Sequence, residues 1–255
     1  MRNGFGAVKT VPIFDCMNRN APTTERRPAK ERLRAFATDF DGTLAHNGTV
    51  PEAALQGLRR LRKAGFVLLM VTGREIEELS QIFTAMDLFD MIVAENGGLL
   101  YSPKDKVIQP LADPPLPALI ARLMAKGVTP VSIGHVIVAT WEPHHHAVLE
   151  AIKELGLELH VIFNKGAVMI LPVGINKATG LEAALQLFKI KPAEVVAVGD
   201  AENDHAMLAL CRFPVAVANA LPSLQEHARH VTKKGRGEGV AELIDMILDP
   251  AFMMP

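Results

Sequence analysis

The stretch from residue 35 to 44, Ala-Phe-Ala-Thr-Asp-Phe-Asp-Gly-Thr-Leu, constrains the fold of this chain more than any other part of it. Its apolar start predicts a buried strand, and Gly42 is a residue type that ends a strand and turns the backbone. Residues two apart on a strand share a face, so Asp39 and Asp41 can direct both carboxylates into one site. Taken alone, the stretch fits a surface Asp-x-Asp-Gly turn equally well, because Asp and Gly are common turn residues.

Two carboxylates at this spacing need a counter-charge, since like charges close together disfavour the doubly ionised state. A hard cation such as Mg²⁺, which prefers oxygen ligands, would stabilise the pair. A proton held on one of the two carboxylates would have the same effect. The sequence therefore indicates either a metal site or a carboxylate with a raised pKa at this strand end.

Three further stretches carry polar groups at the end of an apolar strand or at the start of a helix. They are 67–74 (VLLMVTGR), 176–180 (NKATG) and 195–204 (VVAVGDAEND). The carboxyl ends of parallel strands in a doubly wound sheet border one crevice, where ligands bind. We therefore expect the polar residues of all four stretches to lie around a common site.

With these four stretches in this order, the chain resembles the haloacid dehalogenase superfamily of phosphohydrolases from about residue 33 to 247. Within it, the chain resembles the capped, sugar-phosphatase-like branch (Cof type, subfamily IIB), which includes phosphoglycolate phosphatases. The resemblance implies an α/β fold, with a doubly wound, Rossmann-like parallel sheet and an inserted α+β cap domain. It also implies an Mg²⁺-dependent phosphatase that hydrolyses a small phosphorylated metabolite, a sugar phosphate or a phosphoglycolate-like compound, through an aspartyl-phosphate.

The resemblance also assigns roles to individual residues. Asp39 becomes the nucleophile, a role that suits a carboxylate because it is ionised at neutral pH without a base to activate it. Asp41 gives a proton to the leaving alcohol and later takes one from water. The implied catalytic residues are Asp39, Asp41, Thr72 and Lys177; the substrate-binding residues are Gly42, Gly73, Arg74, Asn96 and Gly97; the metal-binding residues are Asp39, Asp41, Asp200, Asn203 and Asp204. Whether Asn203 or Asp204 touches the metal is left open.

The order of strands and helices divides the chain. Residues 1–32 have no apolar period and are expected to form a flexible N-terminal extension. Strand and helix alternate in 33–98 and again in 173–255, which predicts a hydrolase core with a parallel sheet. Between them, 99–172 contains short strands joined by glycine-containing turns, a pattern typical of antiparallel hairpins, and is expected to form the cap.

Composition excludes several classes of partner. The 255 residues carry 27 basic and 28 acidic side chains, and this balance provides no global field for nucleic acid or anionic lipid. No apolar run approaches the roughly 20 residues that span a bilayer. We expect a small-molecule phosphorylated substrate, no nucleic-acid or membrane partner, a monomer or homodimer, and a cytoplasmic location.

Other interpretations remain at this stage. The same acids, hydroxyl and lysine fit a phosphomutase, or a phospho-accepting signalling or binding domain without turnover. The histidines at 144–146 cannot converge on one metal ion, because consecutive helical residues point about 100° apart. Trp141, the single tryptophan of the chain, is expected in the core of the cap.

Overall fold

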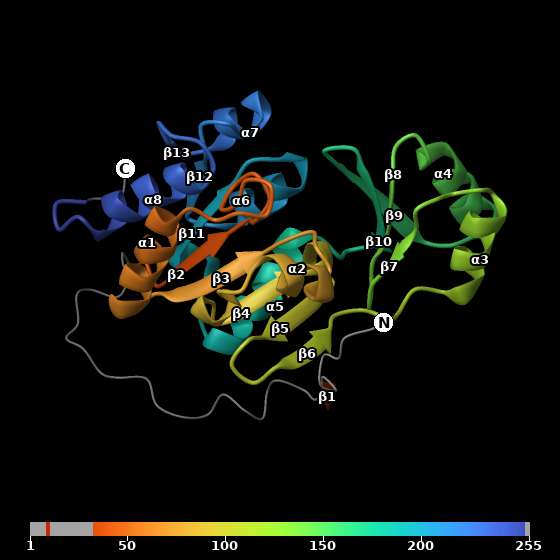
Figure 1. The fold of residues 1–255 in the computed structure, drawn as a ribbon, viewed down its shortest axis with the longest axis horizontal. Coiled ribbons are helices and arrows are strands. Elements are labelled where there is room, and N and C mark those ends of the chain that lie inside the picture. Colours follow the sequence, from red (N-terminus) through yellow and green to blue (C-terminus); the bar gives the residue numbers. More distant parts are fainter. Residues whose placement is uncertain (1–8, 11–32, 253–255) are drawn as a thin grey trace.

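The structure is a computed structural model that describes residues 9–10 and 33–252. A large sheet has nine strands in the order β1-β6-β5-β4-β3-β2-β11-β12-β13 (Figure 1). The strands are β1 Lys9–Thr10, β2 Ala35–Thr38, β3 Val67–Val71, β4 Met91–Ala94, β5 Leu99–Ser102, β6 Val107–Pro110, β11 Val195–Gly199, β12 Phe213–Ala216 and β13 His230–Val231. The run from β4 to β13 is parallel, which confirms the doubly wound α/β fold class.

The central strands are apolar along their whole length because both faces of the sheet are covered. All residues of β2, β4 and β11 are buried. The helices of this part are α1 Glu52–Lys63, α2 Ile76–Ile82, α5 Lys177–Phe188, α6 His205–Leu210, α7 Pro222–His227 and α8 Arg236–Leu248. Helix α1 packs against α8 and α5 packs against α6, while both α1 and α5 contact β3. Continuous burial of this kind is typical of parallel strands between two helical layers.

Short 3-10 helices occupy several loops at the ends of the strands. They are η2 Met86–Leu88, η3 Glu95–Gly97, η4 Pro192–Glu194 and η5 Glu202–Asp204. Two of them, η3 after β4 and η5 after β11, follow the carboxyl ends of parallel strands. These two turns carry polar residues that the sequence predicts for the site.

A second, four-stranded antiparallel sheet has the order β7-β8-β10-β9. Its elements are β7 Ser132–Ile133, β8 Val138–Trp141, β9 Leu159–Asn164, β10 Ala167–Pro172, α3 Pro117–Ala125 and α4 His145–Glu154. In Figure 1 these elements, coloured in shades of green, form a separate body beside the large sheet. The two helices and one face of this sheet enclose their own apolar cluster, centred on Leu123, Val148 and Val168. We refer to this body as the cap.

Two expectations about this region need correction. Strands β5 and β6, expected in the insertion that starts at residue 99, form a hairpin antiparallel to β4 in the large sheet. Leu99 and Leu100 are buried in the core of the large sheet, and this burial attaches the hairpin there. The boundary therefore lies after β6. Trp141 is 54% exposed, so its expected place in the cap core is wrong.

The expectation for residues 1–32 lies outside the described residues, apart from β1, which pairs with β6 in parallel. Among the helices that the structure describes, none combines the length and the apolar character needed to cross a bilayer.

Candidate active site

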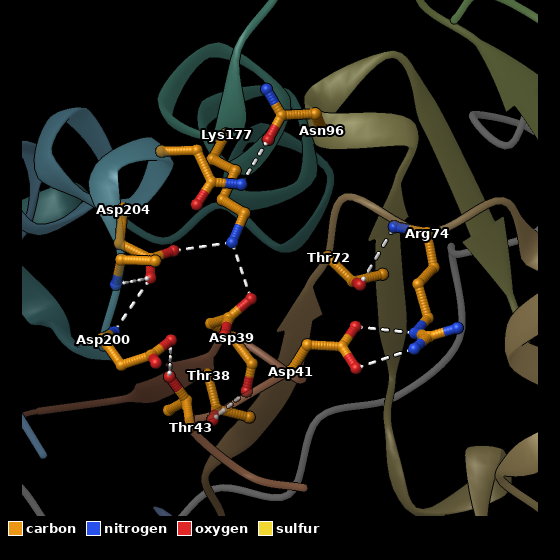
Figure 2. Close-up of polar contacts among 12 residues, drawn as sticks. Thr38, Asp39, Asp41, Thr43, Thr72, Arg74, Asn96, Lys177, Asp200 and Asp204 are labelled. Atoms are coloured by element: carbon orange, nitrogen blue, oxygen red, sulfur yellow. Dashed lines mark hydrogen bonds and ion pairs between the residues drawn. The ribbon is translucent and has the colours of Figure 1, made fainter. Parts of the chain in front are cut away.

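The predicted site residues gather at the carboxyl edge of the parallel strands (Figure 2). Asp39 follows β2, and its backbone N–H donates to the carbonyl oxygen of Val198 in the adjacent strand at 3.0 Å. Three residues on, Gly42 turns the chain with a φ of +91°. A Cβ at Gly42 would lie 2.4 Å from Oδ2 of Asp200, so only glycine fits this turn beside the acids.

Lys177 neutralises the centre of the site. Asn176 caps α5 by accepting hydrogen bonds from the backbone N–H groups of Ala178 and Thr179, and the hydroxyl of Thr179 returns the contact to Asn176. This capping box places Lys177 in the first turn of the helix, directed at the sheet edge. Its Nζ lies 2.6 Å from Oδ1 of Asp39 and 2.6 Å from Oδ1 of Asp204, and its side chain is 1% exposed.

Burial controls the charge states of these groups. Burial raises the pKa of Asp39 to about 7, because desolvation and the neighbouring Asp204 and Asp200 outweigh the lowering effect of Lys177. Burial alone would lower the pKa of Lys177, but Asp204 and Asp39 raise it above its ordinary value. The lysine is therefore charged, and the acids around it carry more negative charge than one ammonium group can balance.

Asp200 and Asp204 differ in how their oxygens are used. Oδ2 of Asp204 accepts hydrogen bonds from the backbone N–H groups of Asp200 and Ala201 at 2.9 and 3.0 Å, and Oδ1 binds Lys177. Both oxygens of Asp204 thus hold the loop and the lysine in place. Asp200 accepts from the hydroxyl of Thr43 and turns Oδ2 toward the cap. Burial raises the pKa of Asp200, against the lowering effect of a cap lysine.

The arrangement fits a hard divalent cation. Asp39, Asp200 and Asp204 are buried, and one carboxylate oxygen of each lies within 4.8 Å of the others. Nζ of Lys165 lies 2.7 Å from the backbone carbonyl oxygen of Asp41 and 2.8 Å from Oδ2 of Asp200, so a cation already contacts both oxygens. Oδ1 of Asn203 is buried without a hydrogen-bond partner in the described structure. Carboxylate, carbonyl and amide oxygens are the ligands that Mg²⁺ uses.

Arg74 and Thr72 border the same site on the side of β3. The guanidinium of Arg74 binds both oxygens of Asp41 (Figure 2), with Nε 2.6 Å from Oδ2 and Nη2 2.9 Å from Oδ1. It also contacts Glu78. The hydroxyl oxygen of Thr72 accepts from the backbone N–H of Arg74 at 3.2 Å. Gly73 between them lies under the cap, because a Cβ there would be 3.5 Å from Sδ of Met169.

Asn96 and Gly97 form the turn after β4. The amide oxygen of Asn96 accepts a 2.8 Å hydrogen bond from Nδ2 of Asn203, and its backbone N–H donates to the carbonyl of Thr72. Asn96 is fully buried with a φ of +53°, and its Nδ2 has no partner among the described residues. A Cβ at Gly97 would lie 2.0 Å from the carbonyl oxygen of Asn176. The glycine thus allows this turn to pack directly on the start of α5.

Four residues of the site were not anticipated from the sequence. The hydroxyl of Thr43 donates to Oδ1 of Asp200 at 3.2 Å. Nδ2 of Asn219 donates to the carbonyl oxygen of Gly42 at 2.9 Å. Glu95 is fully buried and accepts hydrogen bonds from three successive backbone N–H groups of the cap, residues 135–137. Lys165 comes from the cap itself. Asn219 follows the parallel strand β12, so its position after a strand could have placed it at the same sheet edge. No local sequence pattern indicates that Lys165 reaches this site.

Comparison with known proteins agrees with this geometry. Residues 36–129 and 132–244 match the family described as haloacid dehalogenase-like hydrolase. A phosphoglycolate phosphatase of Methanothermobacter thermautotrophicus is 32% identical over 222 residues, which cover 83% of this chain and 97% of the relative. Phosphoglycolate phosphatase 2 of Saccharolobus solfataricus is 30% identical, covering 85% of this chain and 93% of the relative.

Solved structures show the same fold. A haloacid dehalogenase-like hydrolase from Bacteroides thetaiotaomicron superimposes with a TM-score of 0.72 at 20% identity, covering 85% of this chain and all of that structure. A sugar phosphatase of subclass IIB gives a TM-score of 0.68 at 18% identity, with 83% and 98% covered. The chain belongs to the haloacid dehalogenase-like hydrolases. Within that family it is a phosphatase.

Proposed function

We propose that this protein is an Mg²⁺-dependent phosphatase that hydrolyses a small phosphorylated metabolite through an aspartyl-phosphate on Asp39. One observation carries the proposal: Asp39 is 4% exposed, its carboxylate is held by Lys177, and it stands within a group of acids able to hold a metal. A carboxylate in this setting combines a fixed nucleophile with nearby positive charge for a phosphoryl group.

The metal is assigned to the side chains of Asp39 and Asp200 and to the backbone carbonyl of Asp41. Asn203, whose Oδ1 has no partner among the described residues, adds a metal ligand or orients the other ligands. We assign Asp204 to positioning, because Lys177 and two backbone N–H groups use both of its oxygens. Mg²⁺ at these oxygens would supply positive charge that offsets the acids and the phosphoryl oxygens.

Asp39 and Asp41 divide the chemistry. Lys177 holds Oδ1 of Asp39, so we assign the attack on phosphorus to Oδ2. The bond from Asp39 to phosphorus forms as the bond from phosphorus to the alcohol oxygen breaks, and Asp41 gives that oxygen a proton. Asp41 then takes a proton from a water molecule as that water attacks phosphorus. Inorganic phosphate leaves, and the carboxylate of Asp39 is restored.

Arg74, Thr72 and the turn at Asn96 surround the phosphoryl group. The contacts of Arg74 with both oxygens of Asp41 have to loosen before Asp41 can donate a proton. A phosphate oxygen competes for the same guanidinium, since arginine binds phosphate and carboxylate with similar bidentate geometry. We infer that substrate binding draws Arg74 toward the phosphate and frees Asp41. The hydroxyl of Thr72 and Nδ2 of Asn96 provide further donors.

The substrate is assigned by class. The relatives named above are phosphoglycolate phosphatases, and one structural neighbour is a sugar phosphatase. Both names describe phosphate monoesters of small polar molecules, which supports a sugar phosphate or a phosphoglycolate-like substrate here. The monomeric or homodimeric state and the cytoplasmic location stay predictions.

Release of inorganic phosphate from p-nitrophenyl phosphate and from a panel of phosphorylated metabolites tests the proposal. We expect turnover with Mg²⁺ and its loss in chelator. Conversion of a substrate into a phosphate isomer without phosphate release would favour a phosphomutase. Stable phosphorylation of the protein without turnover would favour a phospho-accepting domain.

A further inference from the structure

The cap directs one ammonium group into the acids of the core. Lys165 lies at the tip of the β9–β10 hairpin, and its Nζ bonds the carbonyl oxygen of Asp41 at 2.7 Å and Oδ2 of Asp200 at 2.8 Å. Its side chain is 45% exposed, whereas that of Asp200 is 4% exposed. In the part of the chain that the structure describes, Lys165 is the cap residue hydrogen-bonded to these acids. The lysine therefore lies between solvent and the phosphoryl site.

The hairpin fixes the direction of this side chain. Asn164 pairs with Ala167, which leaves Lys165 and Gly166 as a two-residue turn. Both have positive φ, +49° and +86°, as a tight hairpin of the primed type requires. Strand β9 also packs against η5, the turn that follows Asp200. The turn thus holds Lys165 over the site through backbone geometry and packing.

The two oxygens that Lys165 contacts are those assigned to the metal. The other acids have their own cations in the core, since Lys177 binds Asp39 and Asp204 while Arg74 binds the side chain of Asp41. When these oxygens hold a divalent cation, like-charge repulsion disfavours the ammonium group at the same place. Lys165 then loses both acceptors but stays tethered above the phosphoryl site. Its charge is free to bind an anion there.

Part of the cap surface that faces the core is apolar. Met169 is 4% exposed and lies over Gly73, within a cluster that also contains Val136, Ile137 and Leu171. A sugar leaving group presents several hydroxyls, each of which loses water and needs a hydrogen-bond partner when it is buried. This apolar cluster together with the ammonium group of Lys165 suits a small leaving group with a single negative charge.

We propose that Lys165 is a specificity-determining residue that binds a carboxylate on the leaving group, so that the preferred substrates are small phosphate esters of hydroxy acids. The inference rests on the proposed phosphatase function and names the substrate class within it. Lys165 exchanges partners in each cycle, from Asp41 and Asp200 to the carboxylate of the substrate.

The test compares two esters of nearly equal size, 2-phosphoglycolate and 2-hydroxyethyl phosphate, with Mg²⁺ present. The measured quantity is the ratio of kcat/KM for the charged ester to kcat/KM for the neutral ester. We expect K165M to lower this ratio about 10- to 100-fold, the range for loss of a hydrogen bond to a charged group, mainly through KM. K165R should retain most of the ratio. The matched control K153M removes an exposed lysine of α4 and should leave the ratio unchanged.

Binding measurements separate this proposal from the proposed function. In a D39N background, calorimetry should show that the protein with Lys165 binds 2-phosphoglycolate more tightly than 2-hydroxyethyl phosphate, and that K165M removes the difference. Without substrate, K165M should bind Mg²⁺ about 2- to 5-fold more tightly, since the competing ion pair is partly exposed. Intact protein that hydrolyses p-nitrophenyl phosphate but prefers a neutral ester to 2-phosphoglycolate would overturn the substrate class inferred here, whereas protein that releases phosphate from no ester of the panel would contradict the phosphatase function. An unchanged preference in K165M, or weaker Mg²⁺ binding, would overturn the role of Lys165.

Discussion

Replacing Asp39 by Asn should change the stability of the metal-free protein in a pH-dependent way. The carboxyl group has a pKa of about 7 in the fold and an ordinary value of 3.8. Below pH 3.8 both the folded and the unfolded chain keep the proton, so the ionisation of Asp39 makes no contribution to the free energy of unfolding. Between 3.8 and about 7 the unfolded chain releases the proton while the fold retains it, so stability falls as pH rises.

The size of this effect follows from the same two values. Each pH unit between them corresponds to about 1.4 kcal/mol, so ionised Asp39 costs the fold about 4 kcal/mol above pH 7. D39N removes that cost, which already includes the attraction between ionised Asp39 and Lys177. In chelator we expect D39N to be about 4 kcal/mol more stable than the parent at pH 8, and about 1 kcal/mol more stable at pH 4.5.

Urea unfolding in EDTA at several pH values between 4.5 and 8 measures this difference. D113N, a change of an exposed aspartate in the chain leading to α3, is the matched control and should give a pH-independent difference. Added Mg²⁺ at 100 times its Kd should stabilise the parent by about 2.7 kcal/mol and D39N by less. A stability difference between D39N and the parent that stays constant with pH, or falls as pH rises, would refute the reasoning.

Three other substitutions test the supporting contacts. E95Q should lower the free energy of unfolding by about 2–3 kcal/mol in urea melts, because one amide oxygen cannot replace two carboxylate oxygens that accept from the backbone of residues 135–137. Stability equal to that of the parent would contradict this role of Glu95. N219A should lower the free energy of unfolding by about 1–2 kcal/mol and weaken Mg²⁺ binding in calorimetry, since the hydrogen bonds to Gly42 and to the backbone of Arg236 are lost. An unchanged affinity for Mg²⁺ would remove Asn219 from the site. R74M should lower kcat/KM for 2-phosphoglycolate about 10- to 100-fold, chiefly through KM; a change in kcat alone would argue against phosphate binding by Arg74.

The sequence was sufficient for the parallel core and for the acids at its edge. Continuous apolar runs before Asp39, Thr72 and Asp200 identify buried parallel strands, and the carboxyl ends of such strands meet at one edge. The Lys177 position also followed from sequence, because Asn176 is a helix-capping residue.

Other features depend on contacts between distant segments, which local patterns do not encode. The β5–β6 hairpin has the same alternation whether it extends the large sheet or belongs to the cap; only its pairing with β4 decides. The turn at Lys165 and Gly166 was predictable as a hairpin, but its approach to Asp200 depends on how the cap sits on the core. The roles assigned to Asn203 at the metal and to Asp204 in positioning likewise depend on which of their oxygens other groups already bind.

Detection of a phosphoryl group on Asp39 tests the central claim most directly. The protein is mixed with Mg²⁺ and excess 2-phosphoglycolate, or with the best ester from the metabolite panel, and is quenched in acid during turnover. Borohydride reduction of an acyl-phosphate converts the aspartate to homoserine, which mass spectrometry locates in the peptide. The account predicts homoserine at residue 39 in the parent, none in D39N and none without substrate. Homoserine at another aspartate, or undiminished turnover by D39N, would contradict it.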